Sequence, residues 1–302
     1  MIPFEHFLGL PRDEVAALVK ATGQKVVVFP VNGTRRWFML EHSDKIGDDF
    51  FPAYMEASIQ NHIHLCSMLF DHGVRTILAP VFGRELMRRG DEYTRRVGMD
   101  GLVRTATDRN YREFFEKYNV KVRFYGDYRD VLKGTKFESV LGSLYEVTEA
   151  TKGNTGFNLF FGVFADDATE TSARLSVEHY LAHSAVPDKA TLIRKYYGED
   201  LPPVSLFIGF DKFSTFDMPL LATGEEDLYF SVSPSPYMTE RQLRAILYDH
   251  IYVRRTPEPD YTKMNADELD WLREYYRANS DLAFGVGKLK FNLWFSEIGS
   301  NT

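Results

Sequence analysis

Short apolar runs alternate with longer amphipathic stretches along the chain. Apolar, β-branched runs of strand length predict buried strands; they cover residues 25–31, 74–82, 120–128, 158–167, 204–210 and 228–234. Apolar residues at helical spacing predict helices; these cover residues 54–72, about 84–118, 169–183, 189–197, a segment capped by Thr239, and one starting near Ala266. Strands and helices in this order predict an α/β protein with a largely parallel sheet.

No internal repeat interrupts this order, so we expect one domain over residues 1–302. The segment 133–156, which contains EATKGNTG, has low propensity for regular structure and predicts a mobile loop or an insertion. A chain of 302 residues, 44% hydrophobic, is long enough to bury one large core or two modest ones.

Charge and hydropathy limit the classes of partner that we expect for this chain. The net charge is -7, which argues against nucleic acid as the main partner because phosphate backbones bind basic surfaces. No stretch reaches the roughly 18 apolar residues of a membrane span, and the N-terminus lacks the basic-then-apolar pattern of a secretory leader. We therefore expect a cytoplasmic protein without a stable membrane span. The 24 Phe and 17 Tyr suit either a heavy core or a pocket for an apolar ligand.

Cysteine and histidine offer little chemistry. Cys66, the single cysteine, lies in an apolar run and is interpreted as a small core residue. The histidines in helical sequence lack the flanking glutamate of a zinc-binding helix, so we interpret them as structural or incidental; they are His62, His64, His72 and His250.

The clearest chemical signal follows the first predicted strand, in VFPVNGTRRWF. Gly33 allows a ligand to approach the backbone closely, and the amides near Thr34 are donors at a helix start. Arg35 and Arg36 can add charge-assisted hydrogen bonds to phosphate oxygens. The pattern suits a diphosphate; on the residues alone, a solvated surface turn is the alternative.

The segment NGTRRW resembles the Asp-Gly-Asn-Gly-Arg-Trp motif with which cis-prenyltransferases cradle an allylic diphosphate. Further blocks match a bacterial branch of that family, the tuberculosinol and kolavelool synthases, in order along most of the chain: MLFDHGV, FYGDY, FGVFADDA, FIGFDKFSTFDMPLL, YMTERQLRAILYDHIYVR and DLAFGVG. The resemblance implies a cis-prenyltransferase (undecaprenyl diphosphate synthase-like) fold with a central, mostly parallel sheet flanked by helices. It also implies a homodimer.

One family element is missing. Elongating members bind a second diphosphate through an Arg-Thr-x-Gly-Glu-x-Arg-Leu-Ser stretch, and the matching residues 207–221 contain no arginine. Their charges are Asp211, Lys212 and Asp217. We therefore expect one prenyl diphosphate substrate, which ionises to an allylic cation.

The resemblance then implies a diterpene synthase. Its substrate would be a C20 diphosphate, such as kolavenyl or tuberculosinyl diphosphate, and water would capture the cation to give a kolavelool- or tuberculosinol-type alcohol. The alternatives are transfer of the prenyl group to a nucleoside such as adenosine, and a non-catalytic subunit that has lost activity.

The expected catalytic residues are Asn32, Arg35, Arg36 and Tyr54, with Gly33 and Thr34 joining both arginines in diphosphate binding. Tyr54, at a predicted helix start, would orient water or contact the leaving group; simple core packing is the alternative. Aromatic residues expected to line an apolar pocket and stabilise a cation, or else to pack in the core, are Trp37, Phe207, Phe210, Phe213 and Phe216.

Asn32 departs from the motif, which has an aspartate associated with Mg²⁺ at this position. An amide is a neutral, poor ligand for magnesium. The chain could ionise its substrate without metal, hold Mg²⁺ elsewhere, or carry an engineered change here. Asp91 matches an acidic site of the relatives but is interpreted as part of a solvated helix face. Asp166-Asp167 is interpreted as a helix cap in preference to a metal site, which is the alternative.

Overall fold

The computed structural model describes residues 2–45, 47, 50–84, 88, 90–165 and 167–296. Its strands are β1 (Val26–Val28), β2 (Thr76–Phe82), β3 (Val120–Tyr125), β4 (Phe157–Val163), β5 (Leu206–Phe210), β6 (Asp227–Ser231), β7 (Gly287–Lys290) and β8 (Leu293–Ser296). The first half contributes helices α1 (Phe4–Gly9), α2 (Arg12–Ala21), α3 (Thr34–Glu41), α4 (Phe50–Asp71), α6 (Asp91–Tyr93), α7 (Asp100–Thr107), α8 (Arg109–Lys117), α9 (Tyr128–Leu132) and α10 (Val140–Ala150). The second half contributes α11 (Thr169–His183), α12 (Lys189–Tyr197), α13 (Glu240–Tyr248) and α14 (Ala266–Ala278).

Strands β1 to β6 form one parallel sheet in the order β3-β4-β2-β1-β5-β6, as the sequence predicts. From β1 the chain adds β2 on one side, places β3 at that edge and β4 between β2 and β3, and then crosses to the other side of β1 with β5 and β6. The strand order therefore reverses between β1 and β5. In open parallel sheets, ligands bind beyond the carboxyl ends of the strands at such a point.

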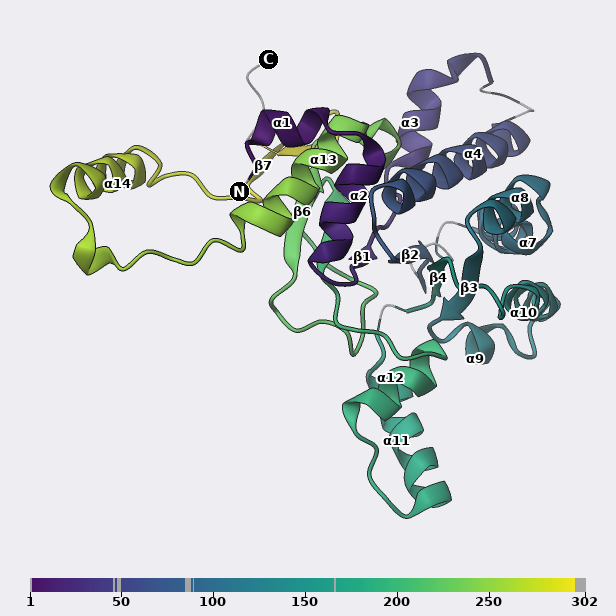
Figure 1. Cartoon of the computed structure of the whole chain (residues 1–302). Coiled ribbons are helices and arrows are strands. Elements are labelled where there is room, and N and C mark those ends of the chain that lie inside the picture. Colours follow the sequence, from purple (N-terminus) through teal and green to yellow (C-terminus); the bar gives the residue numbers. More distant parts are fainter. Residues whose placement is uncertain are drawn as a thin grey trace.

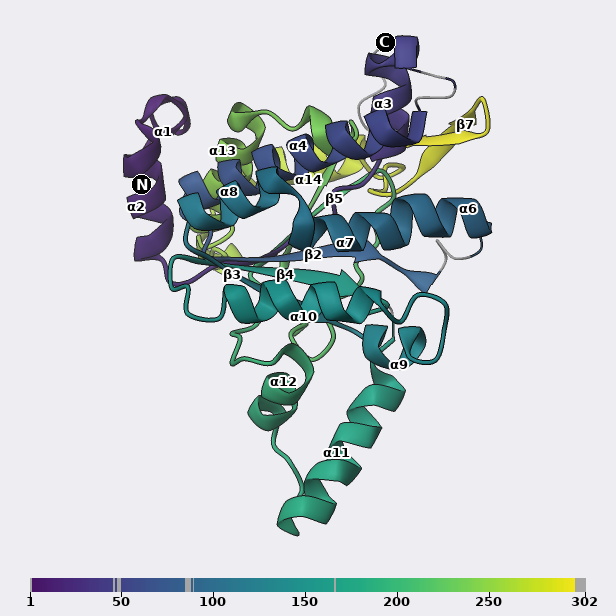
Figure 2. The same ribbon diagram turned by 90° about the vertical axis from the view of Figure 1, so that its right-hand side faces the viewer.

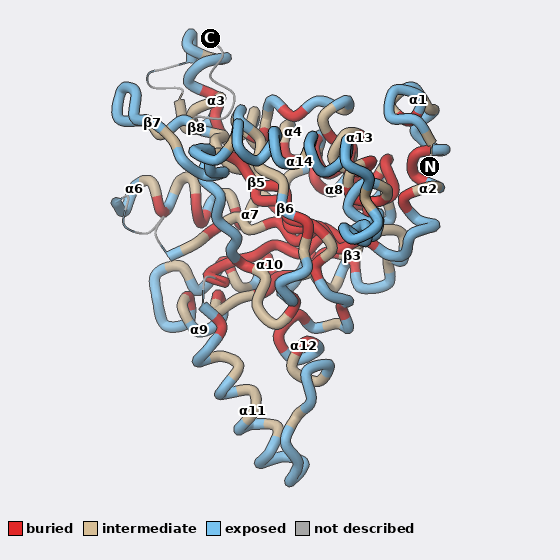
Figure 3. The backbone as a smooth tube through the Cα atoms, turned by 90° about the vertical axis from the view of Figure 1, so that its left-hand side faces the viewer, coloured by how far each residue is buried: buried red, intermediate tan, exposed pale blue. Residues whose placement is uncertain are grey.

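Both faces of the sheet are covered, because successive side chains of a strand point to opposite sides. In β1, Val27 packs into the larger core with α2, α4, α7, α8, α10 and α13, whereas Val26 and Val28 pack into a smaller core with α12. Figures 1 and 2 show these helices on the two sides of the sheet, and Figure 3 shows burial concentrated on the strands. This double burial explains the nearly continuous apolar strand sequences.

The prediction of a loop over residues 133–156 is wrong for the middle of this segment, which forms α10. Val140, Leu144 and Val147 are spaced as one helix face, and all three are buried in the larger core. The glycines and polar residues that follow this helix outweighed its apolar face in the sequence pattern. The capping prediction for Thr239 is confirmed, since its side chain accepts a hydrogen bond from the Gln242 amide at 3.1 Å.

Two parts of the chain extend away from the sheet. Helix α11 projects from one end of the molecule and α14 from one side, and neither contains a buried residue (Figures 1 and 2). Large apolar side chains are exposed on both, including Leu181 and Trp271. Within the described residues, no helix is long and apolar enough to cross a membrane.

Candidate active site

The loop between β1 and α3 forms the centre of the candidate site. Gly33 has φ +77°, in the left-handed region, and immediately precedes the first helical residue, Thr34. Gly33 is the N-cap residue of α3 and has no side chain that could accept a hydrogen bond from the first amides of the helix. These amides also have no partner within the helix. The start of α3 therefore offers backbone donors and a positive dipole end to an anion.

A distant serine fixes this loop. The Asn32 amide donates to the Ser235 hydroxyl at 3.1 Å, and the Ser235 amide donates to the Asn32 carbonyl at 3.0 Å. Ser235 is buried and follows Pro234 in the segment after β6. The backbone polar groups of Asn32 are thus used to hold the loop, which leaves its side chain to face the cavities.

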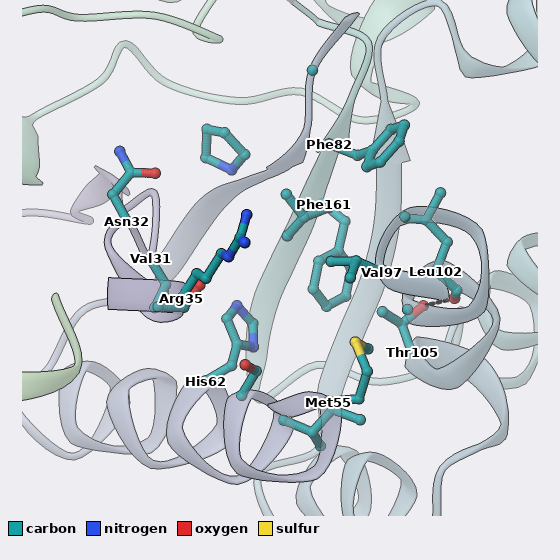
Figure 4. A pocket seen from close by; sticks show the side chains of 18 of the residues that line it. Val31, Asn32, Arg35, Met55, His62, Phe82, Val97, Leu102, Thr105 and Phe161 are labelled. Carbon is teal, nitrogen blue, oxygen red and sulfur yellow. Dashed lines mark hydrogen bonds between the residues drawn. The ribbon is translucent and has the colours of Figure 1, made fainter. Parts of the chain in front are cut away.

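The two arginines of the loop diverge. Arg35 points into the larger cavity, and its guanidinium lies 5.9 Å from the Tyr93 ring centre (Figure 4). Arg36 lies 5.2 Å from the Phe210 ring centre and forms an ion pair with Asp211, Nη2 to Oδ2 at 3.3 Å. Arg35 lines the larger cavity alone, whereas Arg36 lines both the larger cavity and a smaller one beside it.

The larger cavity has a volume of about 730 Å³, within the range of small-molecule sites. Its polar end is the 32–36 segment, and its interior runs between α4, the end of β2, and α7. Figure 4 shows Arg35 with Asn32 on one side and Phe161, Val97 and Met55 on the other. A cationic mouth over an apolar interior suits an anionic head on a hydrocarbon tail.

A π-helical turn, Thr94–Met99, contributes Val97 and Gly98 to this wall. Such turns occur often at functional sites.

Tyr54 lies at this mouth and is also part of the core. Its hydroxyl is 2.8 Å from the Thr34 hydroxyl, while its ring stacks on Phe50 with centroids 5.6 Å apart. Burial raises the pKa of Tyr54, so the phenol stays protonated and able to donate. The structure thus shows Tyr54 packed in the core with its hydroxyl beside Thr34, and its expected role toward water or a leaving group stays a prediction.

His62 also lines the larger cavity, which the sequence interpretation missed. Its Nδ1 lies 3.0 Å from the Tyr111 hydroxyl, and burial lowers the pKa of His62 to about 4. The ring is therefore neutral at pH 7. The sequence did contain a signal for this position of His62. Tyr54, Ser58 and His62 are spaced four residues apart, which places three polar side chains on one face of α4.

A smaller cavity of about 290 Å³ adjoins the first at the end of β5. The two share Asn32, Gly33, Arg36 and Phe216. Of the aromatic residues expected at the pocket, Phe207 and Phe210 line only the smaller cavity. The expectation for Trp37 and Phe213 is corrected, because neither lines either cavity.

The positions of these two side chains explain the correction. Trp37 follows the three cavity residues of the first turn of α3 and packs edge-on to His42. Phe213 is 46% exposed and packs behind Phe230.

The acidic candidates lie away from this site. Asp91 is solvated and pairs with Lys136 at 3.3 Å, as expected for an exposed helix face. Asp167 accepts a hydrogen bond from the amide of Thr169, the first residue of α11, although the N-cap position itself is occupied by Ala168. Asp166 lies outside the described residues. Cys66 is buried in the core, as expected.

The donors that the described residues bring to these cavities do not fit a Mg²⁺ ion held by the protein. Among the described residues, no three His, Cys, Asp or Glu side chains are grouped to hold a metal. In the part of the chain that the structure describes, the carboxylates lining the cavities are Asp211, which pairs with Arg36, and the buried Asp217. Asn32 offers a neutral amide where a magnesium ligand is normally a carboxylate.

Comparison with known proteins places this site in a family. The chain is 43% identical over 299 residues to tuberculosinyl adenosine transferase of Mycobacterium tuberculosis (strain CDC 1551 / Oshkosh), covering 98% of this chain and 99% of that protein. The chain belongs to the tuberculosinyl adenosine transferase family. It is also 21% identical over 295 residues to (+)-kolavelool synthase of Herpetosiphon aurantiacus, covering 97% of this chain and 94% of that protein. No protein-family model matches the chain.

Solved structures show the fold of this family member. Lavandulyl diphosphate synthase from Lavandula x intermedia, solved with dimethylallyl diphosphate, superposes with a TM-score of 0.55 at 14% identity, covering 80% of this chain and 97% of that chain. A probable undecaprenyl diphosphate synthase from Campylobacter jejuni gives 0.54 at 17% identity, covering 78% and 98%. The predicted cis-prenyltransferase fold is confirmed.

Proposed function

We propose that the chain transfers a diterpenyl group from its C20 diphosphate to a nucleoside such as adenosine. The observation that carries this proposal is the 43% identity along nearly the full length to a tuberculosinyl adenosine transferase. The comparisons favour this alternative over water capture to an alcohol, because the match to (+)-kolavelool synthase is only 21% identical. Both relatives are enzymes, which disfavours a non-catalytic subunit.

The geometry supports the first half of this reaction. The amides at the start of α3 and the guanidinium groups of Arg35 and Arg36 would bind the diphosphate and stabilise the negative charge that grows as it leaves. Each charge-assisted hydrogen bond of this kind is worth about 1.5–3 kcal/mol. The hydrocarbon would occupy the 730 Å³ cavity, where His62 is neutral and adds no charge that would repel an allylic cation.

The test is incubation of the protein with tuberculosinyl diphosphate, with and without adenosine, followed by mass spectrometry. We expect a diterpenyl nucleoside when adenosine is present. Arg35→Ala should reduce its formation by about 10-fold or more, since it removes at least one charge-assisted hydrogen bond. Arg109→Ala is the matched control, because Arg109 is 89% exposed and pairs with Glu113 on the surface of α8. Alcohol as the sole product, with adenosine in excess, would contradict transfer.

We also propose a homodimer, which the resemblance implies. Exposed apolar side chains on the projecting helices, such as Leu181 and Trp271, give a second copy surfaces to cover. Light scattering tests this, and a monomer at all concentrations would contradict it.

A further inference from the structure

The smaller cavity opens beside the proposed diphosphate site. Asn32, Gly33 and Arg36 form a wall common to both cavities. A molecule bound in the smaller cavity would therefore lie next to the head of a prenyl diphosphate, where the bond to the leaving group breaks. It would approach from the β5 side of the β1–β5 crevice, away from the hydrocarbon cavity.

The walls of the smaller cavity are aromatic. The Phe207 and Phe230 rings lie 5.8 Å apart at an interplanar angle of 37°, and Phe216 meets Phe207 edge-on at 5.5 Å. Gly209 of β5 allows this arrangement, because a Cβ there would lie 2.8 Å from ring atoms of both Phe207 and Phe230. Flat, apolar walls of this kind bind the π-face of a planar ring, as aromatic side chains do with nucleobases.

Besides the shared Asn32 and Arg36, the polar side chains that line this cavity are of mixed charge: Asp211, Lys212 and Ser214. Asp211 has φ +71° and Asp217 has φ +55°, so the segment they bound leaves β5 through strained backbone. The Asp211 carboxylate offsets Arg36 at 3.3 Å. Among its described lining residues this cavity has one carboxylate and no second arginine, so it is poorly suited to another diphosphate and suits a neutral ring that carries donors.

We propose that the smaller cavity binds the base of the acceptor nucleoside, a purine, against the aromatic wall of Phe207, Phe216 and Phe230. This inference rests on the proposed transfer reaction. In the transfer step, a lone pair of a purine nitrogen forms the new C–N bond. The allylic C–O bond breaks, and the diphosphate leaves with its electron pair. A ring nitrogen becomes cationic, and an exocyclic amine loses a proton to solvent; neither route requires an oxidant.

Phe230→Ala is the main test, because Phe230 lines only the smaller cavity and removing its ring leaves the diphosphate clamp in place. We expect the KM for adenosine to rise about 10-fold, as loss of base stacking predicts, with the KM for the prenyl diphosphate unchanged within about twofold. Tyr145→Ala is the control, since this exposed aromatic residue lies on α10. Equal changes in both KM values, or no change in either, would overturn the proposal.

A second variant guards against misfolding. Ser214 is exposed at the cavity, so Ser214→Trp adds bulk without removing core contacts. It too should raise the KM for adenosine selectively, with an unchanged melting temperature, and a normal KM for adenosine would overturn the proposal.

Calorimetric titration of adenosine, with inorganic diphosphate present, separates this inference from the proposed function. If adenosine binds the unmodified protein and this binding is lost in Phe230→Ala, the cavity assignment is supported. Failure to form a conjugate, with this binding pattern intact, would refute only the transfer reaction. Absence of adenosine binding, or full binding by Phe230→Ala, would overturn the assignment of the cavity.

Discussion

Replacing Gly33 with alanine tests the geometry on which the diphosphate site depends. At φ +77° a non-glycine residue costs about 1–2 kcal/mol. A Cβ at this position would also lie 2.8 Å from Phe210 Cε1 and 2.8 Å from Pro234 Cβ, and such overpacking costs about 1–3 kcal/mol. We therefore expect Gly33→Ala to lower the free energy of unfolding by about 2–5 kcal/mol. Displacement of the loop should also weaken diphosphate binding.

Gly23→Ala is the matched control for this experiment. Gly23 has φ +95°, but a Cβ at this residue would have no neighbouring atom within 4 Å, so its substitution incurs only the conformational cost of about 1–2 kcal/mol. Urea unfolding of both variants isolates the contact energy, and titration with inorganic diphosphate measures the effect on the site. Equal destabilisation of the two variants, with diphosphate affinity intact in Gly33→Ala, would refute the packing of Gly33 against Phe210 and Pro234.

Three further predictions concern single side chains. Asn32→Asp should make product formation sensitive to a chelator, whereas the unmodified chain should keep its activity; equal insensitivity would show that the residue at this position does not decide metal use. Burial lowers the pKa of His62 from 6.5 to about 4, so its stabilising effect is full above pH 6.5 and is lost as pH falls to 4, by about 3 kcal/mol. His62→Gln should reduce this acid sensitivity, measured as the melting temperature between pH 7 and 4. The Arg12 hydrogen bond lowers the pKa of Glu240 to about 2, so this stabilisation is full above about pH 4.5 and is lost toward pH 2. Glu240→Gln should cost about 1 kcal/mol at pH 7 after solvent screening, and the difference in unfolding free energy should shrink below pH 4.

The elements with strong local signals were predictable from sequence. Strands buried on both faces require continuous apolar runs, so Val26–Val28 and Leu206–Phe210 were evident without any alignment. The loop over residues 32–36 gave a local signal of another kind: a strand, a glycine and two arginines occur within a dozen residues. These residues alone also suited a surface turn, and the family resemblance was needed to favour a diphosphate site.

Contacts between distant segments were not predictable in this way. Ser235 holds the Asn32 loop across 203 residues, and nothing in the sequence around either residue indicates that pairing. The same holds for Phe230, whose contribution to the smaller cavity depends on β6 lying beside β5. Resemblance to a family supplied the arrangement of segments, but it could not show which side chains, such as Trp37, turn away from the cavities.

The ion pair between Arg36 and Asp211 implies that the two ligands favour each other's binding. The pair is 3.3 Å long and its side chains are 32% and 22% exposed, so it contributes at most about 1 kcal/mol, and a diphosphate with several negative charges should compete well for Arg36. Release of Asp211 would leave its carboxylate facing the smaller cavity, where it can accept a hydrogen bond from an exocyclic amine. We therefore expect inorganic diphosphate to raise the affinity for adenosine, by calorimetry, and we expect Asp211→Asn to reduce this coupling. Because coupling between two ligands is reciprocal, adenosine should raise the affinity for diphosphate by the same factor, and independent binding of the two would refute the coupling.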